Sequence, residues 1–267
     1  MSSMVRGCTI AHEWAGRDEP APTVDLIWGH GLTQSRTLED AFGVLDWSNI
    51  AARVLRYDAR GHGESDSTAD LDGYSWEALA HDQLALATAA GVEAYVAGGA
   101  SMGSATALHA AVLAPSRVSG LILMIPPTGW EQRSAQTDAY EQGAKIVEAH
   151  GVEPLIKAGA LVAPPDPFVD DAEYHARRAE ALRGWDTTRL AHAMRGAVRA
   201  QLPTRDAIAT ISCPTLILAW SGDPVHPVGT AEELARLIPH AVVDIASHAI
   251  DVAQWTQRIA DFIATFD

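Results

Sequence analysis

The chain has 267 residues, of which 48% are hydrophobic, and 34 Asp and Glu against 19 Lys and Arg give it a formal net charge of −15. This length suffices for one large hydrophobic core, or for a core domain that carries a smaller inserted one. An average field this negative repels polyanions, so the composition argues against nucleic acid and anionic membranes as partners.

Cysteine usage and hydropathy indicate a soluble protein of a reducing compartment. Cys8 and Cys213 lie far apart in the chain and lack any CxxC spacing, which argues against a disulfide framework and against a thiolate metal site. The N-terminal segment holds no apolar run of signal-peptide length, and nowhere do about 18 uncharged apolar residues follow one another. We therefore expect a cytoplasmic protein, whose oligomeric state these features leave open.

Short apolar segments rich in β-branched residues predict strands at 9–14, 24–28, 54–58, 94–98, 121–125, 215–220 and 242–245. Several are nearly continuous hydrophobic runs, which is typical of strands buried on both faces. Helical stretches such as 75–90, 104–114 and 230–237 lie between them. This alternation predicts an α/β fold with a mostly parallel twisted sheet covered by helices.

The strand signal stops between about residues 126 and 205, where the pattern becomes helical and the segment 164–167 (PPDP) divides it. The pattern of apolar strands alternating with helices resumes with the predicted strand at 215–220. We therefore predict an α/β core built from residues 1–126 and 206–267, with residues 127–205 forming an inserted helical cap.

The segment 99–103 (GASMG) follows a predicted strand directly and begins a helix of small residues. A serine on such a tight strand-to-helix turn is held in a strained conformation, and its neighbours must be small because adjacent chain presses against them. This context indicates a nucleophile elbow with Ser101 as the nucleophile.

A serine nucleophile needs a histidine base and an acid that orients the histidine, both in loops that follow strands. Asp223 follows the strand at 215–220, and His248 follows the strand at 242–245, so the chain order Ser, Asp, His predicts these two residues. Asp223 also fits a turn beside Gly222. His226 is the weaker alternative as base, because we expect it to make local bonds in its proline-bounded loop.

The segment 28–32 (WGHGL) ends an early strand, and its glycines allow the backbone to approach a ligand closely. We expect the backbone N–H groups of Leu32 and Met102 to form the oxyanion hole, the second at a helix N-terminus that favours negative charge. His30 would then be structural.

With these motifs the chain resembles the α/β-hydrolases that carry a helical cap. The likeness covers nearly the whole core through the segments 30–32 (HGL), 58–65 (DARGHGES), 99–103, 222–223 and 247–248. Within that family the stretch 53–58 (RVLRYD), followed by 73–75 (GYS), is most similar to 3-oxoadipate enol-lactone hydrolases, and the chain is also similar to carboxylesterase-like members. The resemblance implies hydrolysis of a small ester or lactone through an acyl-enzyme intermediate.

Two alternatives stay open. Similar elbows and caps occur in C–C bond hydrolases and in cofactor-free perhydrolases, and some relatives of this fold are ligand-binding signalling proteins with slow turnover. No third glycine at dinucleotide spacing, phosphate loop or HExxH motif is present, so we expect chemistry without a cofactor or a metal.

The substrate-binding residues are the least determined part. Trp130 and Trp185 are candidate pocket walls, although aromatic residues suit a cap core equally well. The predicted cap is also rich in arginine, at positions 177, 178, 183, 189, 195 and 199. We interpret these arginines as solvated helix faces with acidic partners such as Glu173 for Arg177, with a carboxylate clamp as the alternative.

Overall fold

The computed structural model describes residues 1–16 and 22–266, and within them the strands form one sheet with the order β1-β2-β4-β3-β5-β6-β7-β8. The strands are β1 (Ser2–Val5), β2 (Cys8–Ala15), β3 (Asp25–Gly29), β4 (Arg53–Tyr57), β5 (Tyr95–Ala100), β6 (Val118–Met124), β7 (Thr215–Trp220) and β8 (Ala241–Ala246). β1 pairs antiparallel with β2, and β2 with β4, whereas every pairing from β4 to β8 is parallel. The predicted α/β fold with a mostly parallel sheet is therefore confirmed.

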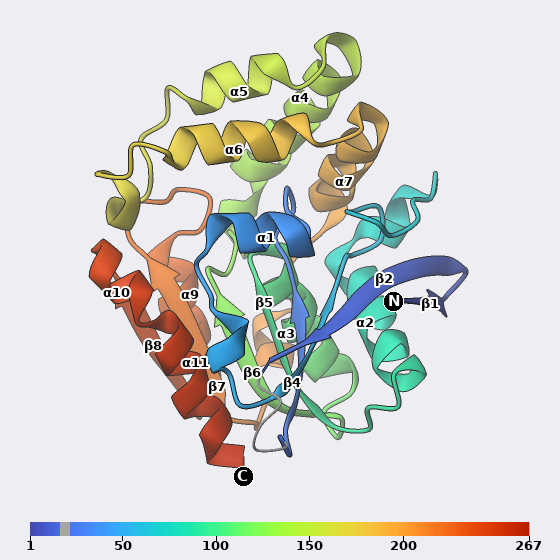
Figure 1. Ribbon diagram of the computed structural model, residues 1–267, viewed down its shortest axis with the longest axis vertical. Coiled ribbons are helices and arrows are strands. Elements are labelled where there is room, and N and C mark those ends of the chain that lie inside the picture. The colour runs from blue at the N-terminus through green and yellow to red at the C-terminus, as the bar shows by residue number, and fades with distance from the viewer. Residues whose placement is uncertain (17–21, 267) are drawn as a thin grey trace.

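Helices cover both faces of the sheet (Figure 1). The α-helices are α1 (Arg36–Phe42), α2 (Trp76–Ala89), α3 (Met102–Leu113), α4 (Arg133–His150), α5 (Glu153–Gly159), α6 (Tyr174–Arg183), α7 (Thr187–Arg199), α8 (Arg205–Ile208), α9 (Val228–Leu237), α10 (Ala249–Ala253) and α11 (Trp255–Ile263). Short 3-10 turns are η1 (Trp47–Asn49), η2 (Leu71–Tyr74), η3 (Trp130–Gln132), η4 (Asp166–Phe168) and η5 (Ala264–Phe266). None of the helices in the described part of the chain is long and apolar enough to cross a membrane.

Side chains of the central strands alternate between two hydrophobic cores, one on each face of the sheet. In β5, Ala97 belongs to the core that α2, α3 and α9 cover, whereas its neighbour Val96 belongs to the core that α11 covers. Leu55 and Val54 of β4 divide in the same way. Successive strand residues point to opposite faces, so a strand between two helical layers must be apolar at every position. This explains the continuous hydrophobic runs in the sequence.

The predicted strands all form, and the structure adds β1, which the sequence pattern does not predict. β1 holds Met4, which is 70% exposed, and pairs only with β2 at the sheet edge. An edge strand with one exposed face needs no apolar run, so the sequence gives little periodic signal there. The other strand boundaries differ from the predicted ones by a few residues.

The segment between β6 and β7 contains only helices and turns, and it lies above the carboxyl ends of the strands, at the top of Figure 1. α4 and α7 pack on each other through a small core of their own, which includes Val147, Leu190 and Met194. One arginine ties this layer to the core, and a second links two of its own helices. Arg189 of α7 donates to backbone carbonyls of residues 61–65, and Arg133 of α4 donates to the carbonyls of Ala197 and Ala200. The boundaries of the cap, 127–205, stay a prediction.

Candidate active site

Ser101 lies on the sharp turn between β5 and α3 and has a φ of 51°. This left-handed backbone conformation costs a residue with a side chain about 1 to 3 kcal/mol, so the surrounding structure must impose it. The turn is held by a 2.9 Å hydrogen bond from the Ser101 N–H to the carbonyl of Met124. It also requires glycine at 103, because a Cβ there would lie 1.9 Å from the carbonyl oxygen of Gly29. The strain predicted for the nucleophile elbow is present.

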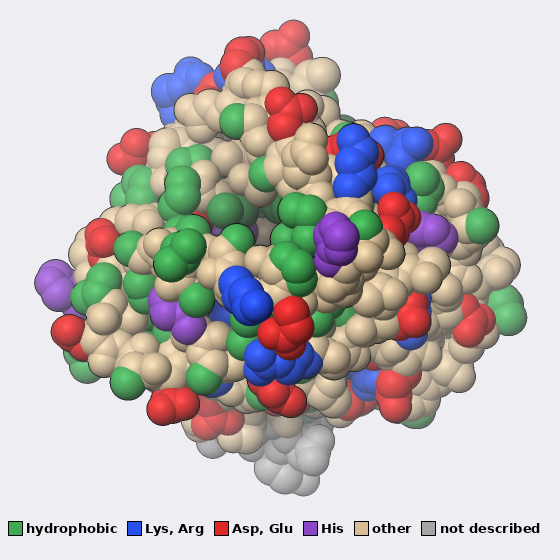
Figure 2. Space-filling model, turned by 90° about the horizontal axis from the view of Figure 1, so that it is seen from above, with side chains coloured by type: hydrophobic (Ala, Val, Ile, Leu, Met, Phe, Trp, Pro, Cys, Tyr) green, Lys and Arg blue, Asp and Glu red, His purple; other side chains and the backbone are tan. Residues whose placement is uncertain are grey.

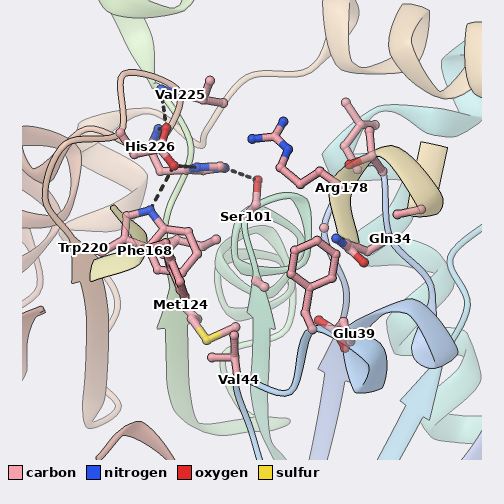
Figure 3. A pocket seen from close by; sticks show the side chains of 18 of the residues that line it. Gln34, Glu39, Val44, Ser101, Met124, Phe168, Arg178, Trp220, Val225 and His226 are labelled. Carbon is pink, nitrogen blue, oxygen red and sulfur yellow. Dashed lines mark hydrogen bonds and ion pairs between the residues drawn. The ribbon is translucent and has the colours of Figure 1, made fainter. Parts of the chain in front are cut away.

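The structure brings Ser101 together with two side chains from the loop after β7 (Figure 3). His226 Nε2 lies 2.8 Å from the hydroxyl oxygen of Ser101, and His226 Nδ1 lies 2.8 Å from Asp223 Oδ2. An ionised carboxylate only accepts hydrogen bonds, so the proton of a neutral imidazole resides on Nδ1 and leaves Nε2 free to accept the serine proton. The three groups thus form a continuous chain of hydrogen bonds.

Asp223 is held in its ionised form. Burial alone would raise the pKa of this carboxyl, but hydrogen bonds from His226, Trp220 Nε1 and the N–H of Val225 outweigh burial and keep its pKa well below the ordinary range. The side chains of Asp223 and His226 are only 12% and 15% exposed. A permanently charged, fixed carboxylate is suited to orient the imidazole and to stabilise its protonated form.

The structure contradicts the prediction that His248 is the base. Its side chain is 80% exposed, and its Nδ1 lies 3.4 Å from Asp251 rather than near Ser101. Asp251 accepts hydrogen bonds from the backbone N–H groups of Ser247 and His248 and so caps the first turn of α10. This cap begins the helix directly after β8 and leaves the ring on the surface.

The sequence does contain a signal for His226, in the segment 222–227 (GDPVHP). Gly222 has a φ of 78°, and two prolines restrict the rest of the loop, so residues 223 and 226 are turned toward each other. The expectation that His226 makes local bonds is correct. That local bond, to Asp223, is what orients the ring, and it does not exclude contact with Ser101.

The residues predicted to form the oxyanion hole lie beside the serine. Met102 is the first residue of α3, so its N–H has no partner within the helix. Gly31, which precedes Leu32, approaches Ser101 so closely that a Cβ on it would lie 3.8 Å from the serine Cβ. His30 Nδ1 contacts the carbonyl of Gly31 at 2.8 Å, and in a planar peptide this fixes the Leu32 N–H in the opposite direction. His30 therefore has a structural contact, as predicted.

A cavity of about 360 Å³ opens beside Ser101 and His226. Its walls are mainly apolar, and they come from the core and from α4, α5, α6 and α7, with Val44, Met124, Phe168, Leu182 and Trp220 among them. Trp130 and Trp185 are not among its lining residues, so the structure does not support them as pocket walls. Trp130 donates to the carbonyl of Pro203 and Trp185 to that of Thr33, and both pack at the junction of the helical layer with the core.

Few ionisable groups face this cavity besides Asp223 and His226. Burial raises the pKa of Glu39 to about 7, although Trp28 Nε1 donates to both of its oxygens at 3.2 Å. Gln34 follows the expected oxyanion loop, and its Oε1 is buried without a hydrogen bond among the described residues. Arg178 of α6 also lines the cavity, and in Figure 3 it lies on the same side of Ser101 as Gln34 and Glu39. A small apolar ligand with one or two polar groups fits such a lining.

Comparison with known sequences identifies the family. Residues 30–255 match the family described as alpha/beta hydrolase fold. The chain is 29% identical over 207 residues to 3-oxoadipate enol-lactonase 1 of Acinetobacter baylyi, a match that covers 76% of this chain and 74% of the relative. It is 28% identical over 245 residues to a putative carbamate hydrolase, RutD, of Escherichia coli, covering 87% and 86% of the two chains.

Solved structures agree in fold. A hydrolase from Pseudomonas aeruginosa superposes with a TM-score of 0.80 at 24% identity, over 100% of this chain and 97% of the other. The enol-lactonase of Burkholderia xenovorans superposes with a TM-score of 0.77 at 19% identity, over 100% and 98%. At these identities the likeness concerns the fold alone.

Proposed function

Because the chain belongs to the alpha/beta hydrolase fold family, we propose that it is a serine hydrolase that cleaves a small ester or lactone through an acyl-enzyme. Ser101 is the nucleophile, His226 the general base and Asp223 the group that orients the imidazole. The single observation that supports this most strongly is the hydrogen-bonded series from Asp223 through His226 to Ser101, with both distances 2.8 Å.

In the first half of the reaction, Ser101 Oγ attacks the carbonyl carbon of the substrate while His226 Nε2 takes the hydroxyl proton. The carbonyl oxygen becomes negatively charged in the tetrahedral intermediate, and the N–H groups of Leu32 and Met102 donate hydrogen bonds to it. Collapse of the intermediate breaks the bond to the alkoxide oxygen, which receives the proton from His226. With a lactone, the leaving hydroxyl stays attached to the acyl group.

In the second half, His226 takes a proton from water, and the resulting nucleophile attacks the acyl-enzyme. The intermediate collapses to the free acid, and Ser101 regains its proton. Throughout both halves Asp223 stays ionised, because the hydrogen bonds described above lower its pKa. The mainly apolar cavity favours a small substrate with a limited number of polar groups.

The test compares four variants on a panel of short-chain esters and lactones, with product acid measured in a pH-stat. Ser101→Ala and His226→Ala each lower kcat by about 10³-fold or more. The first removes the nucleophile and the second the base, and neither group is effective without the other. His248→Ala is the matched control and stays within about twofold of the parent. A fluorophosphonate probe labels the parent and the His248→Ala variant at Ser101, and not the Ser101→Ala variant.

Two results would refute this assignment. Undiminished ester turnover by Ser101→Ala would exclude the acyl-enzyme, and a loss of activity in His248→Ala with retention in His226→Ala would exclude His226 as the base. Circular dichroism spectra of all variants must match the parent, so that a loss of activity reports on chemistry.

A further inference from the structure

Arg178 differs from every other arginine of the helical layer between residues 127 and 205 in what its guanidinium contacts. Arg183 pairs with Glu153, Arg195 with Glu148 and Arg199 with Asp72. The sequence predicts Glu173 as the partner of Arg177, but in the structure Arg177 pairs with Asp171. The remaining arginines, at 133, 189 and 205, donate to backbone carbonyls or carboxylates.

For Arg178 the described part of the chain supplies neither a carboxylate nor a carbonyl. Its Nη1 donates to the phenolic oxygen of Tyr174 at 3.2 Å, and its guanidinium carbon lies 5.7 Å from the centre of that ring. Tyr174 is itself 7% exposed and lines the cavity, so it is a fixed support one helical turn from the arginine. The contact leaves most of the five N–H donors of the guanidinium unused.

The guanidinium points into the cavity toward Ser101 (Figure 3). Among the described residues that line the cavity, Arg178 is the one Lys or Arg. Two carboxyl groups line the same cavity, and both have other partners: Asp223 accepts from His226, Trp220 and Val225, and both oxygens of Glu39 accept from Trp28 Nε1. Gln34, whose Oε1 is buried and has no hydrogen-bond partner within residues 1–16 and 22–266, adds an amide group to the same cavity.

The wider charge distribution makes this arrangement informative. The chain carries a net charge of −15, and on the face seen from the cap end basic side chains lie beside acidic ones (Figure 2). Such a protein offers many carboxylates with which a surface arginine can pair. Arg178 pairs with no carboxylate of the described residues, and it faces the reactive serine across an apolar cavity. Its guanidinium is therefore complementary to an anionic ligand.

We infer that Arg178 binds a carboxylate of the substrate, so that the ester or lactone cleaved at Ser101 carries a free carboxylate elsewhere in the molecule. The planar guanidinium donates two parallel hydrogen bonds to the two carboxylate oxygens, a geometry that lysine does not reproduce. Arg178 thereby determines specificity, whereas Ser101 and His226 perform the bond cleavage. This inference rests on the proposed function.

The experiment uses two pairs of esters that differ only in a carboxylate or a methyl group at the end of one chain. On the acyl side the pair is monoethyl glutarate and ethyl pentanoate, and on the alcohol side it is 4-acetoxybutanoate and butyl acetate. We expect the parent to prefer the anionic member of at least one pair. Arg178→Gln lowers kcat/KM for that anionic ester by about tenfold, mainly through KM, and leaves the neutral ester within about twofold.

Two further variants separate recognition from other effects. Arg183→Gln removes one positive charge from the same helix at a residue whose guanidinium pairs with Glu153, so it controls for net charge and leaves the anionic-to-neutral ratio unchanged. Arg178→Lys keeps the charge and loses the planar fork, and retains part of the preference. An equal loss on both members of a pair in Arg178→Gln would assign the arginine a packing role and overturn the inference, as would an unchanged ratio.

A binding measurement distinguishes failure of the inference from failure of the proposed function. Glutarate binding to the Ser101→Ala variant, followed by calorimetry, does not require turnover. Binding that Arg178→Gln weakens about tenfold supports the carboxylate site even if no ester is hydrolysed. Absence of glutarate binding together with hydrolysis of only the neutral esters would overturn the inference and leave the serine hydrolase standing.

Discussion

Glu39 offers a quantitative test of the cavity's electrostatics. Its side chain is 13% exposed, and burial raises its pKa from 4.5 to about 7. More than about one unit below pH 4.5 the carboxyl is protonated in both the folded and the unfolded chain, so it contributes nothing to the pH dependence there. As the pH rises above 4.5, the unfolded chain ionises first, and stability is lost until the folded group also ionises near pH 7.

The magnitude follows from the size of this shift. One pKa unit corresponds to about 1.4 kcal/mol, so the penalty grows to about 3 kcal/mol above pH 7 and is under about 1 kcal/mol at pH 5. Glu39→Gln removes the ionisation while its Oε1 still accepts the hydrogen bond from Trp28. The free energy of unfolding of this variant, relative to the parent, should therefore increase by about 2.5 kcal/mol between pH 5 and pH 8.

Urea unfolding followed by tryptophan fluorescence at both pH values measures the difference directly. The control is Glu77→Gln on α2, where water screens the exposed carboxylate and the same difference should stay under about 0.5 kcal/mol. A difference for Glu39→Gln that is flat with pH, or that falls as the pH rises, would refute the argument that burial dominates the titration of this group.

Three further changes test other parts of the structure. Gly103→Ala places a Cβ 1.9 Å from the Gly29 carbonyl and should lower the free energy of unfolding by about 3 kcal/mol, measured in urea against Gly159→Ala, whose Cβ meets nothing within 4 Å. Arg133→Met leaves the buried carbonyl of Ala200 without this donor, while the carbonyl of Ala197 keeps the N–H of Ala200, and should cost about 2 kcal/mol in the same assay, so a neutral result would contradict the role of this arginine. Asp223→Asn should lower kcat about 10³- to 10⁴-fold in steady-state assays with little change in KM, and a loss seen only in KM would argue against orientation of the imidazole.

Much of the fold could be predicted from the sequence because burial on both faces leaves a local signature. β7 was predicted at its observed bounds, since its residues are buried at every position and a breaker precedes it. β1 could not be predicted in the same way, because only one of its four residues is buried. The nucleophile was also local, since its turn requires small residues at 99 and 103 in the chain itself.

The identity of the base could not be predicted from the local sequence. Two histidines, His226 and His248, each follow a strand that ends at the same edge of the sheet, and the order of residues alone does not separate them. The decision depends on side-chain direction. Asp251 caps α10 and leaves His248 on the surface, whereas the loop 222–227 turns His226 inward. The carboxylate clamp at Arg178 depended equally on knowing which arginines find partners in space.

Asp223 and His226 lie on one loop, and this determines which strands must be fixed relative to each other for the candidate triad to stay aligned. Asp223 and His226 both follow β7, so the candidate triad needs only the ends of β5 and β7 to be fixed relative to each other. β6 lies between these two strands and pairs with both, which buries the connection in the centre of the sheet. β8 is the edge strand and contributes none of the three side chains. Changes that loosen the β8–α10 turn should therefore affect stability before they affect the alignment of Ser101 with its base, a separation that a base on His248 would not allow.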